Sequence, residues 1–203
     1  MIYRLTWFFC QLLFRTFLPR TVVGAENVPA SGPVILASNH LSMVDPPAVA
    51  TSVWRHCVSM AKEELFEKPL IGWYLRKIGA FPVKRGTADR SALKHTLDAL
   101  EQGKALLMFP EGTRSETGEL REPELGVAMI AYRSGAPVVP VYVWGTDNAM
   151  PKGKGLRSAA IGIQFGEPLR FTLPGGAKAG RAEYEQAARD IMSAIAGLRE
   201  SRR

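Results

Sequence analysis

Short apolar runs bounded by glycine or proline recur along this chain and alternate with stretches of helical periodicity. Apolar runs of about four to eight residues between such turn signals are typical of strands buried in a parallel sheet. The alternation predicts an α/β fold with a partly parallel, mixed central sheet flanked by helices. We predict strands at residues 32–38, 56–60, 80–83, 105–109, 137–143 and 159–165, and helices within 62–78 and at 89–102, 125–132 and 180–199.

The first residues have a different character. The stretch MIYRLTWFFCQLLFRTFL is rich in large apolar and aromatic side chains, but Arg4, Gln11 and Arg15 interrupt it. Because these three lie seven and four positions apart, they fall on one narrow face of a helix. Two arginines argue against a bilayer span. We therefore predict an amphipathic membrane-interface helix at 1–20 and one domain at 21–203, with a helix buried in the core as the alternative to membrane anchoring.

The positive charge of the chain predicts an anionic partner. The net charge is +7 and the sequence pI is about 9.6, which suits nucleic acid, an anionic lipid surface or a phosphorylated substrate. The basic residues gather at Lys84 and Arg85, within 152–157, and near the C-terminus, where we expect Arg199 to be solvated surface charge.

Cysteine and histidine are sparse. Cys10 and Cys57 show no paired spacing, and the three histidines are scattered without the spacing of metal ligands. We therefore expect no disulfide framework and no metal site.

A histidine and an aspartate stand five positions apart in Asn-His-Leu-Ser-Met-Val-Asp, residues 39–45, directly after the apolar run that ends at 38. A histidine that transfers protons needs a partner that fixes its tautomer, and a carboxylate is the usual choice. Asp45 is predicted to cap a helix whose first residue is Pro46. A structural His40 and an Asp45 that only caps are the alternative that the pair alone leaves open.

Three further segments follow in order: GAFPVKRG at 79–86, FPEGTRS at 109–115 and APVVPV at 136–141. Together with residues 39–45 they resemble the glycerolipid acyltransferases, specifically the 1-acylglycerol-3-phosphate (lysophosphatidic acid) O-acyltransferases. The resemblance covers roughly residues 24–150 and implies the function of the site residues.

By this resemblance, His40 is the general base that removes a proton from the acceptor hydroxyl, and Asp45 orients and stabilises its imidazole. A positioned base contributes about 10²- to 10⁴-fold to such a step. The segments 79–86 and 109–115 imply residues that bind the phosphate of the acceptor, since guanidinium groups and glycine-lined backbone suit phosphate. These residues are Arg85, Glu111, Gly112, Thr113 and Arg114, of which Glu111 is expected to orient a donor or the acceptor hydroxyl, since a bare carboxylate would repel phosphate.

The resemblance also implies substrates and location. It predicts transfer of a fatty acyl group from acyl-CoA or acyl-carrier protein to 1-acylglycerol-3-phosphate, which gives phosphatidic acid. No cofactor is expected beyond that thioester co-substrate. The expected partners are membrane lipids, the lysophospholipid substrate and acyl carrier protein, without nucleic acid, at the cytoplasmic face of the membrane as a peripheral or monotopic protein.

Relatives often carry Phe-Lys-Lys-Gly after the arginine loop, whereas this chain has acidic residues at Glu122 and Glu124. The acceptor therefore has an alternative: another lysolipid, such as a lyso-aminolipid, or glycerol-3-phosphate. A covalent acyl intermediate on Ser42 is a second alternative, disfavoured because no nucleophile elbow is present. A basic nucleic-acid-binding module is a third, disfavoured because no reader motif accompanies the charge.

Overall fold

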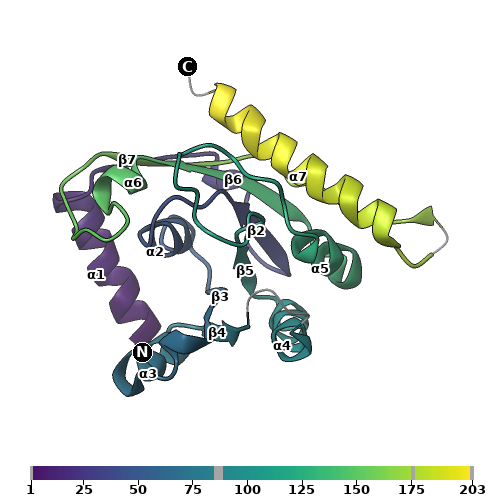
Figure 1. Cartoon of the computed structure of the whole chain (residues 1–203), viewed down its shortest axis with the longest axis horizontal. Coiled ribbons are helices and arrows are strands. Elements are labelled where there is room, and N and C mark those ends of the chain that lie inside the picture. Colours follow the sequence, from purple (N-terminus) through teal and green to yellow (C-terminus); the bar gives the residue numbers. More distant parts are fainter. Residues whose placement is uncertain (1, 85–88, 175–176, 202–203) are drawn as a thin grey trace.

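The computed structural model describes residues 2–84, 89–174 and 177–201. Its centre is a seven-stranded sheet with the strand order β1-β7-β6-β2-β5-β3-β4 (Figure 1). The neighbours β6, β2, β5, β3 and β4 run parallel, and β7 runs antiparallel to β6. The predicted mixed sheet is thus confirmed. The strands are β1 Arg20–Val23, β2 Val34–Ser38, β3 Cys57–Lys62, β4 Ala80–Val83, β5 Ala105–Met108, β6 Val138–Trp144 and β7 Ile161–Phe165.

Helices cover both faces of the sheet (Figure 1). One core cluster joins α1, α2 and α6 to the side chains of Val34 and Leu36 in β2. The other joins α4, α5 and α7 to Ile35 and Ala37, which alternate with them along the same strand. The α-helices are α1 Ile2–Thr16, α2 Asp45–Ala50, α3 Pro69–Lys77, α4 Arg90–Glu101, α5 Gly126–Ser134, α6 Thr146–Ala149 and α7 Arg181–Ser201, with 3-10 helices η1 Ala25–Asn27 and η2 Glu63–Leu65.

Two short elements do not follow from the apolar pattern. Strand β1 lies at the edge of the sheet and three of its four residues are exposed, so it has no continuous buried run. Its only strand partner among the described residues is β7, which lies far along the chain. Helix α6 has four residues, too few to show a helical period.

Helix α1 lies within the predicted segment 1–20, but its faces are not arranged as the sequence predicts. Gln11 points toward the domain, where its amide donates to the carbonyl of Thr51 and accepts from Arg20. Phe14, 2% exposed, belongs to the core. The face turned to solvent is apolar and holds Leu5, Phe8, Phe9 and Leu12, each at least half exposed.

Among the described helices, none is both long enough and apolar enough to cross a bilayer. Helix α1 instead packs on the sheet domain, since its core residue Phe14 contacts the same cluster as β2 and α2.

The parallel pairing of β2 with β5 decides where the site residues meet. Val34 is in register with Ala105, so both strands end at the same edge of the sheet. Residues 39–45 follow β2 at that edge, and residues 109–115 follow β5. The carboxyl edge of parallel strands is where open α/β sheets place their ligand sites.

Candidate active site

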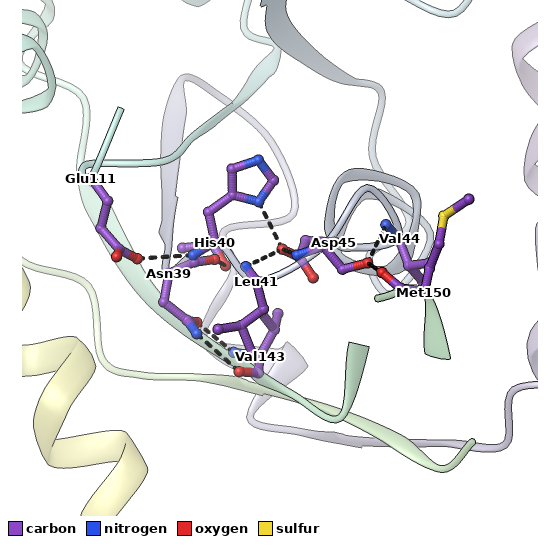
Figure 2. Close-up of polar contacts among 10 residues, drawn as sticks. Asn39, His40, Leu41, Val44, Asp45, Glu111, Val143 and Met150 are labelled. Atoms are coloured by element: carbon purple, nitrogen blue, oxygen red, sulfur yellow. Dashed lines mark hydrogen bonds and ion pairs between the residues drawn. The ribbon is translucent and has the colours of Figure 1, made fainter. Parts of the chain in front are cut away.

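The turn between β2 and α2 holds a histidine ring against a carboxylate (Figure 2). Nδ1 of His40 lies 2.7 Å from Oδ2 of Asp45, and the two side chains are 10% and 0% exposed. An ionised carboxylate only accepts hydrogen bonds, so Nδ1 carries the hydrogen and Nε2 keeps a free lone pair. The turn thus holds the imidazole in the tautomer that accepts a proton at Nε2.

Asp45 also holds the backbone of this turn. Its Oδ2 accepts from the N–H groups of Leu41, at 2.6 Å, and Ser42, at 2.7 Å. Helix α2 begins at Asp45 itself, and the residue at the N-cap position is Val44, which has no side-chain cap. The prediction that Asp45 caps the helix is therefore wrong. The two prolines that follow it lack N–H groups, so the carboxylate turns back to the preceding backbone.

An aromatic ring fixes the plane of the imidazole. Phe109, directly after β5, stacks on His40 with 3.9 Å between ring centroids and 19° between ring planes. The hydrogen bond to Asp45 and this stacking together restrict both the position and the rotation of the ring. The sequence analysis assigned no role to Phe109, although it stands at the start of the quoted FPEGTRS segment.

Glu111 ties the two segments of the site together. Oε1 accepts from the backbone N–H of His40 at 2.9 Å, and Oε2 accepts from that of Arg121 at 3.1 Å. The side chain is buried, which raises the pKa of its carboxyl group, while the two backbone hydrogen bonds act in the opposite direction. Both oxygens therefore have partners within the protein, and the phosphate-binding role stays a prediction.

Two further polar side chains that sequence reasoning missed support the turn. The amide of Asn39 donates to the carbonyl of Val143 at 3.0 Å and accepts from its N–H at 2.7 Å, so it extends the pairing of β2 with β6 (Figure 2). The hydroxyl of Ser42 donates to the carbonyl of Met150 at 3.0 Å. The Ser42 hydroxyl is thus engaged with a backbone carbonyl, which argues against its acting as the nucleophile.

The FPEGTRS segment is hydrogen-bonded directly to the β2–α2 turn. The N–H of Ser115 donates to the carbonyl of His40 at 2.7 Å. Gly112 has a φ of 67°, a left-handed conformation that favours glycine. A Cβ added to Gly112 would lie 2.1 Å from Oε1 of Glu124, so the acidic segment lies against this loop.

The remaining predicted phosphate-binding residues lie in or near this loop. Thr113 and Arg114 are half-buried. Within the described parts of the chain, the guanidinium of Arg114 forms no hydrogen bond or ion pair, so it is available to a ligand. Arg85 lies outside the described residues.

No group of three or more His, Cys, Asp or Glu side chains within residues 2–84, 89–174 and 177–201 is arranged to hold a metal ion. Cys10 and Cys57 are both free thiols. The absence of a metal cofactor stays a prediction.

Comparison with known proteins identifies the family. The model of the family described as Acyltransferase matches residues 19–144, which include the whole β2–α2 turn and the FPEGTRS loop. This chain belongs to the acyltransferase family.

Curated members of the acyltransferase family include two informative relatives. A 1-acyl-sn-glycerol-3-phosphate acyltransferase from Bacillus subtilis is 34% identical over 150 residues, covering 73% of this chain and 72% of the relative. The chloroplastic 1-acyl-sn-glycerol-3-phosphate acyltransferase BAT2 from Brassica napus is also 34% identical, over 140 residues that cover 68% of this chain. This chain spans only 40% of the length of that plant relative.

A solved structure confirms the fold of this acyltransferase family member. The crystal structure of the 1-acyl-sn-glycerophosphate (LPA) acyltransferase PlsC from Thermotoga maritima superposes with a TM-score of 0.79 at 28% identity. The match covers 98% of this chain and 79% of the other. The resemblance inferred from the four sequence segments is therefore confirmed at the level of family and fold.

The C-terminal helix of this acyltransferase family member reaches the FPEGTRS loop. Nη1 and Nη2 of Arg199 in α7 donate to the two carboxylate oxygens of Glu119 at 2.6 and 3.0 Å. This ion pair lowers the pKa of the Glu119 carboxyl. The backbone carbonyl of Glu119 accepts from the hydroxyl of Ser115 at 2.7 Å. Arg199 is exposed, as expected of surface charge, but it also forms an ion pair, because the fold brings α7 beside a loop eighty residues earlier.

Arg199→Glu is expected to raise the KM for the acceptor about two- to fivefold and to leave kcat within about twofold. Both side chains are partly exposed, and exposed ion pairs have small effects. The double variant Arg199→Glu with Glu119→Arg should restore the KM, because it re-forms the pair with its charges exchanged. Steady-state kinetics measure both parameters. A double variant with a KM as high as that of the single variant would contradict the role of the Arg199–Glu119 pair in holding this loop.

Proposed function

We propose that this protein transfers a fatty acyl group from acyl-CoA or an acyl-carrier-protein thioester to the free hydroxyl of 1-acylglycerol-3-phosphate, giving phosphatidic acid for phospholipid biosynthesis. The observation that supports this most directly is the bonded unit formed by the His40–Asp45 pair and the loop that contains Arg114. The N–H of Ser115 donates to the carbonyl of His40 itself. The backbone thus links a proton acceptor to a guanidinium that has no partner among the described residues. The names of the relatives, 1-acyl-sn-glycerol-3-phosphate acyltransferases, support the same acceptor.

The geometry supports a direct transfer. Nε2 of His40 takes the proton of the acceptor hydroxyl while the hydroxyl oxygen attacks the carbonyl carbon of the thioester. The resulting tetrahedral intermediate collapses as the carbon–sulfur bond breaks, and the imidazolium returns its proton to the departing thiolate. The carboxylate of Asp45, 2.7 Å from Nδ1, stabilises the positive imidazolium between the two steps.

The acceptor phosphate would be held by the loop after β5. Among the described residues the guanidinium of Arg114 has no partner, and a guanidinium binds phosphate through two parallel hydrogen bonds. The missing side chain at Gly112 leaves room for the carboxylate of Glu124 rather than for a phosphate, so the phosphate contact in this proposal rests on Arg114. In this proposal Glu111 positions the loop, because its two oxygens accept from His40 and Arg121.

Replacing Arg114 by alanine is expected to raise the KM for 1-acylglycerol-3-phosphate about ten- to hundredfold, since hydrogen bonds to charged groups contribute roughly 1.5–3 kcal/mol. The matched control is Arg133→Ala, because Arg133 is exposed near the end of α5. Acyl transfer is measured across a panel of 1-acylglycerol-3-phosphate, glycerol-3-phosphate and a lyso-aminolipid. Activity on the lyso-aminolipid alone, without dependence on Arg114, would overturn the proposed acceptor.

The acidic segment after the loop makes that panel necessary. The carboxylate of Glu124 lies against Gly112, and the N–H of Glu124 donates to the carbonyl of Pro110 at 2.8 Å. A carboxylate beside a phosphate site disfavours the most negatively charged acceptors through repulsion of like charges. Glu124 is therefore the residue of this loop most able to shift the preference toward another lysolipid.

The location that we propose is the surface of a membrane, as a peripheral or monotopic protein on the cytoplasmic face, where acyl thioesters are available. Support comes from α1, whose solvent-facing residues include Phe8 and Phe9, 61% and 64% exposed. A contiguous exposed apolar face on a helix is typical of a segment that lies in the bilayer interface. Membrane lipids would also present the acceptor, whose acyl chain is insoluble in water.

A further inference from the structure

A cavity lies away from the candidate active site. Its volume is about 910 Å³, within the range of small-molecule sites, and it is bordered by α1, the loop that precedes β3, and the end of α3. The residues of its lining that matter to its chemistry are aromatic or basic: Tyr3, Arg4, Trp7, Trp54, Arg55 and Lys77.

The cavity lies at the amino edge of the sheet. The guanidinium of Arg55 donates to the carbonyls of Gly32 and Gly103, the latter at 2.7 Å. Gly32 comes just before β2 and Gly103 just before β5, whereas His40 and Glu111 come just after these strands. A strand of five residues spans about 16 Å. The cavity therefore lies at the opposite edge of the sheet from the groups proposed to perform acyl transfer.

The aromatic residues of the cavity include two tryptophans in contact, one of which is exposed. The rings of Trp7 and Trp54 are 4.6 Å apart between centroids, and Trp54 is 89% exposed. The hydroxyl of Tyr3 donates to the carbonyl of Arg55 at 3.0 Å, which fixes the ring at the cavity wall. Exposed tryptophan beside anchored tyrosine is typical of protein surfaces at the level of lipid headgroups.

The charge around the cavity is positive. Arg4, Arg55 and Lys77 line it, and no aspartate or glutamate does so within the described residues. Arg55 is satisfied by backbone carbonyls, which leave its charge without a countercharge. In the part of the chain that the structure describes, neither Arg4 nor Lys77 forms an ion pair. The cavity is therefore complementary to an anion.

The cavity also continues onto the apolar face of α1. Phe8 lines the cavity and is 61% exposed, so the same side chain belongs to both surfaces. A ligand that suits this arrangement has an anionic head for the basic rim and an apolar tail for the exposed face of α1.

We propose that this amino-edge cavity binds the phosphate headgroup of an anionic phospholipid of the bilayer, at a site separate from the catalytic one. The proposal rests on the proposed function only in placing α1 at a membrane. Such a site would orient the protein with its catalytic edge in a defined position relative to the lipid surface, and would make membrane binding depend on the fraction of anionic lipid.

The test compares two full-length double variants with the same change in charge. Arg4→Glu with Lys77→Glu alters the cavity, and Lys178→Glu with Arg189→Glu alters exposed residues on the α7 side of the sheet. Binding is measured by co-sedimentation with phosphatidylcholine vesicles that contain or lack phosphatidylglycerol. We expect the cavity variant to lose at least about tenfold in affinity for the phosphatidylglycerol vesicles, and the control to lose about twofold or less. Equal losses in the two variants would overturn the proposal.

Two further measurements separate the possible explanations. Trp54→Ala, which is tolerated because the side chain is exposed, should weaken binding to the same vesicles several-fold. Soluble short-chain phosphatidylglycerol should compete with the vesicles, whereas competition by inorganic phosphate of equal strength would show a site for free phosphate and overturn the lipid assignment. His40→Ala should retain full vesicle binding. Loss of acyl transfer with binding retained, or the reverse, thus distinguishes failure of the proposed function from failure of this site.

Discussion

His40→Ala is expected to lower kcat for acyl transfer about 10²- to 10⁴-fold, because the acceptor hydroxyl then has no positioned base. The variant should remain folded. Among the described residues, the side chain that is lost makes one hydrogen bond, to Asp45, whose Oδ2 still accepts from the N–H groups of Leu41 and Ser42. Loss of one such bond costs roughly 1–3 kcal/mol, which lowers the Tm of a domain of this size by about 2–4 °C for each kcal/mol.

The matched control is His95→Ala. His95 is exposed on α4, and its Nδ1 contacts the carbonyl of Ser91 within the same helix. This variant should keep its kcat within about twofold. Thermal unfolding followed by circular dichroism measures whether each variant is folded, and turnover of 1-acylglycerol-3-phosphate measures its kcat. A folded His40→Ala variant that retains activity would remove the proposed general base.

Asp45→Asn is expected to lower kcat about 10²- to 10⁴-fold and to change the acceptor KM by less than about threefold. The amide retains one oxygen that accepts from the N–H groups of Leu41 and Ser42, but it removes the negative charge that stabilises the imidazolium of His40. An effect on kcat without an effect on KM is expected of a group that acts only in the chemical step. Stopped-assay kinetics with varied acceptor concentration measure both parameters.

The double variant provides a sharper test of Asp45. If Asp45 acts through His40, then His40→Ala combined with Asp45→Asn should be no slower than His40→Ala alone. Asp190→Asn is the control, because Asp190 is exposed on α7 and bonds only to Gln186 among the described residues. Additive losses in the double variant would mean that Asp45 has a role independent of the histidine.

Much of the sheet follows from local sequence patterns. Strand β4 lies where the apolar run 80–83 predicts it, and β2, β5, β6 and β7 lie inside or within a residue of their predicted ranges. The buried strands have continuous apolar runs because helices cover both faces of the sheet. Edge strand β1 was not predicted, because most of its residues face solvent and its pairing depends on a strand that is distant in the sequence.

The contacts of the site are likewise of two kinds, local ones that the sequence predicts and ones between strands that it does not. A spacing of five residues across a strand-to-helix turn sufficed to predict that His40 and Asp45 meet, since the contact is local. The contacts that hold the pair in place are not local. Stacking by Phe109 and the hydrogen bonds of Glu111 cross between β2 and β5, and those of Asn39 cross from β2 to β6. No periodicity in the sequence encodes which strands become neighbours.

The sequence by itself determined the alternation of strands and helices, the histidine–aspartate pair and the likeness to the acyltransferase family. The tertiary structure decided which faces those elements turn to one another. A helical period places Arg4, Gln11 and Arg15 together, yet it does not say which side of α1 packs on the domain. The fold directs Gln11 inward and exposes Phe8 and Phe9. The physical reason is that periodicity is a property of one segment, whereas burial depends on the surface that other segments present to it.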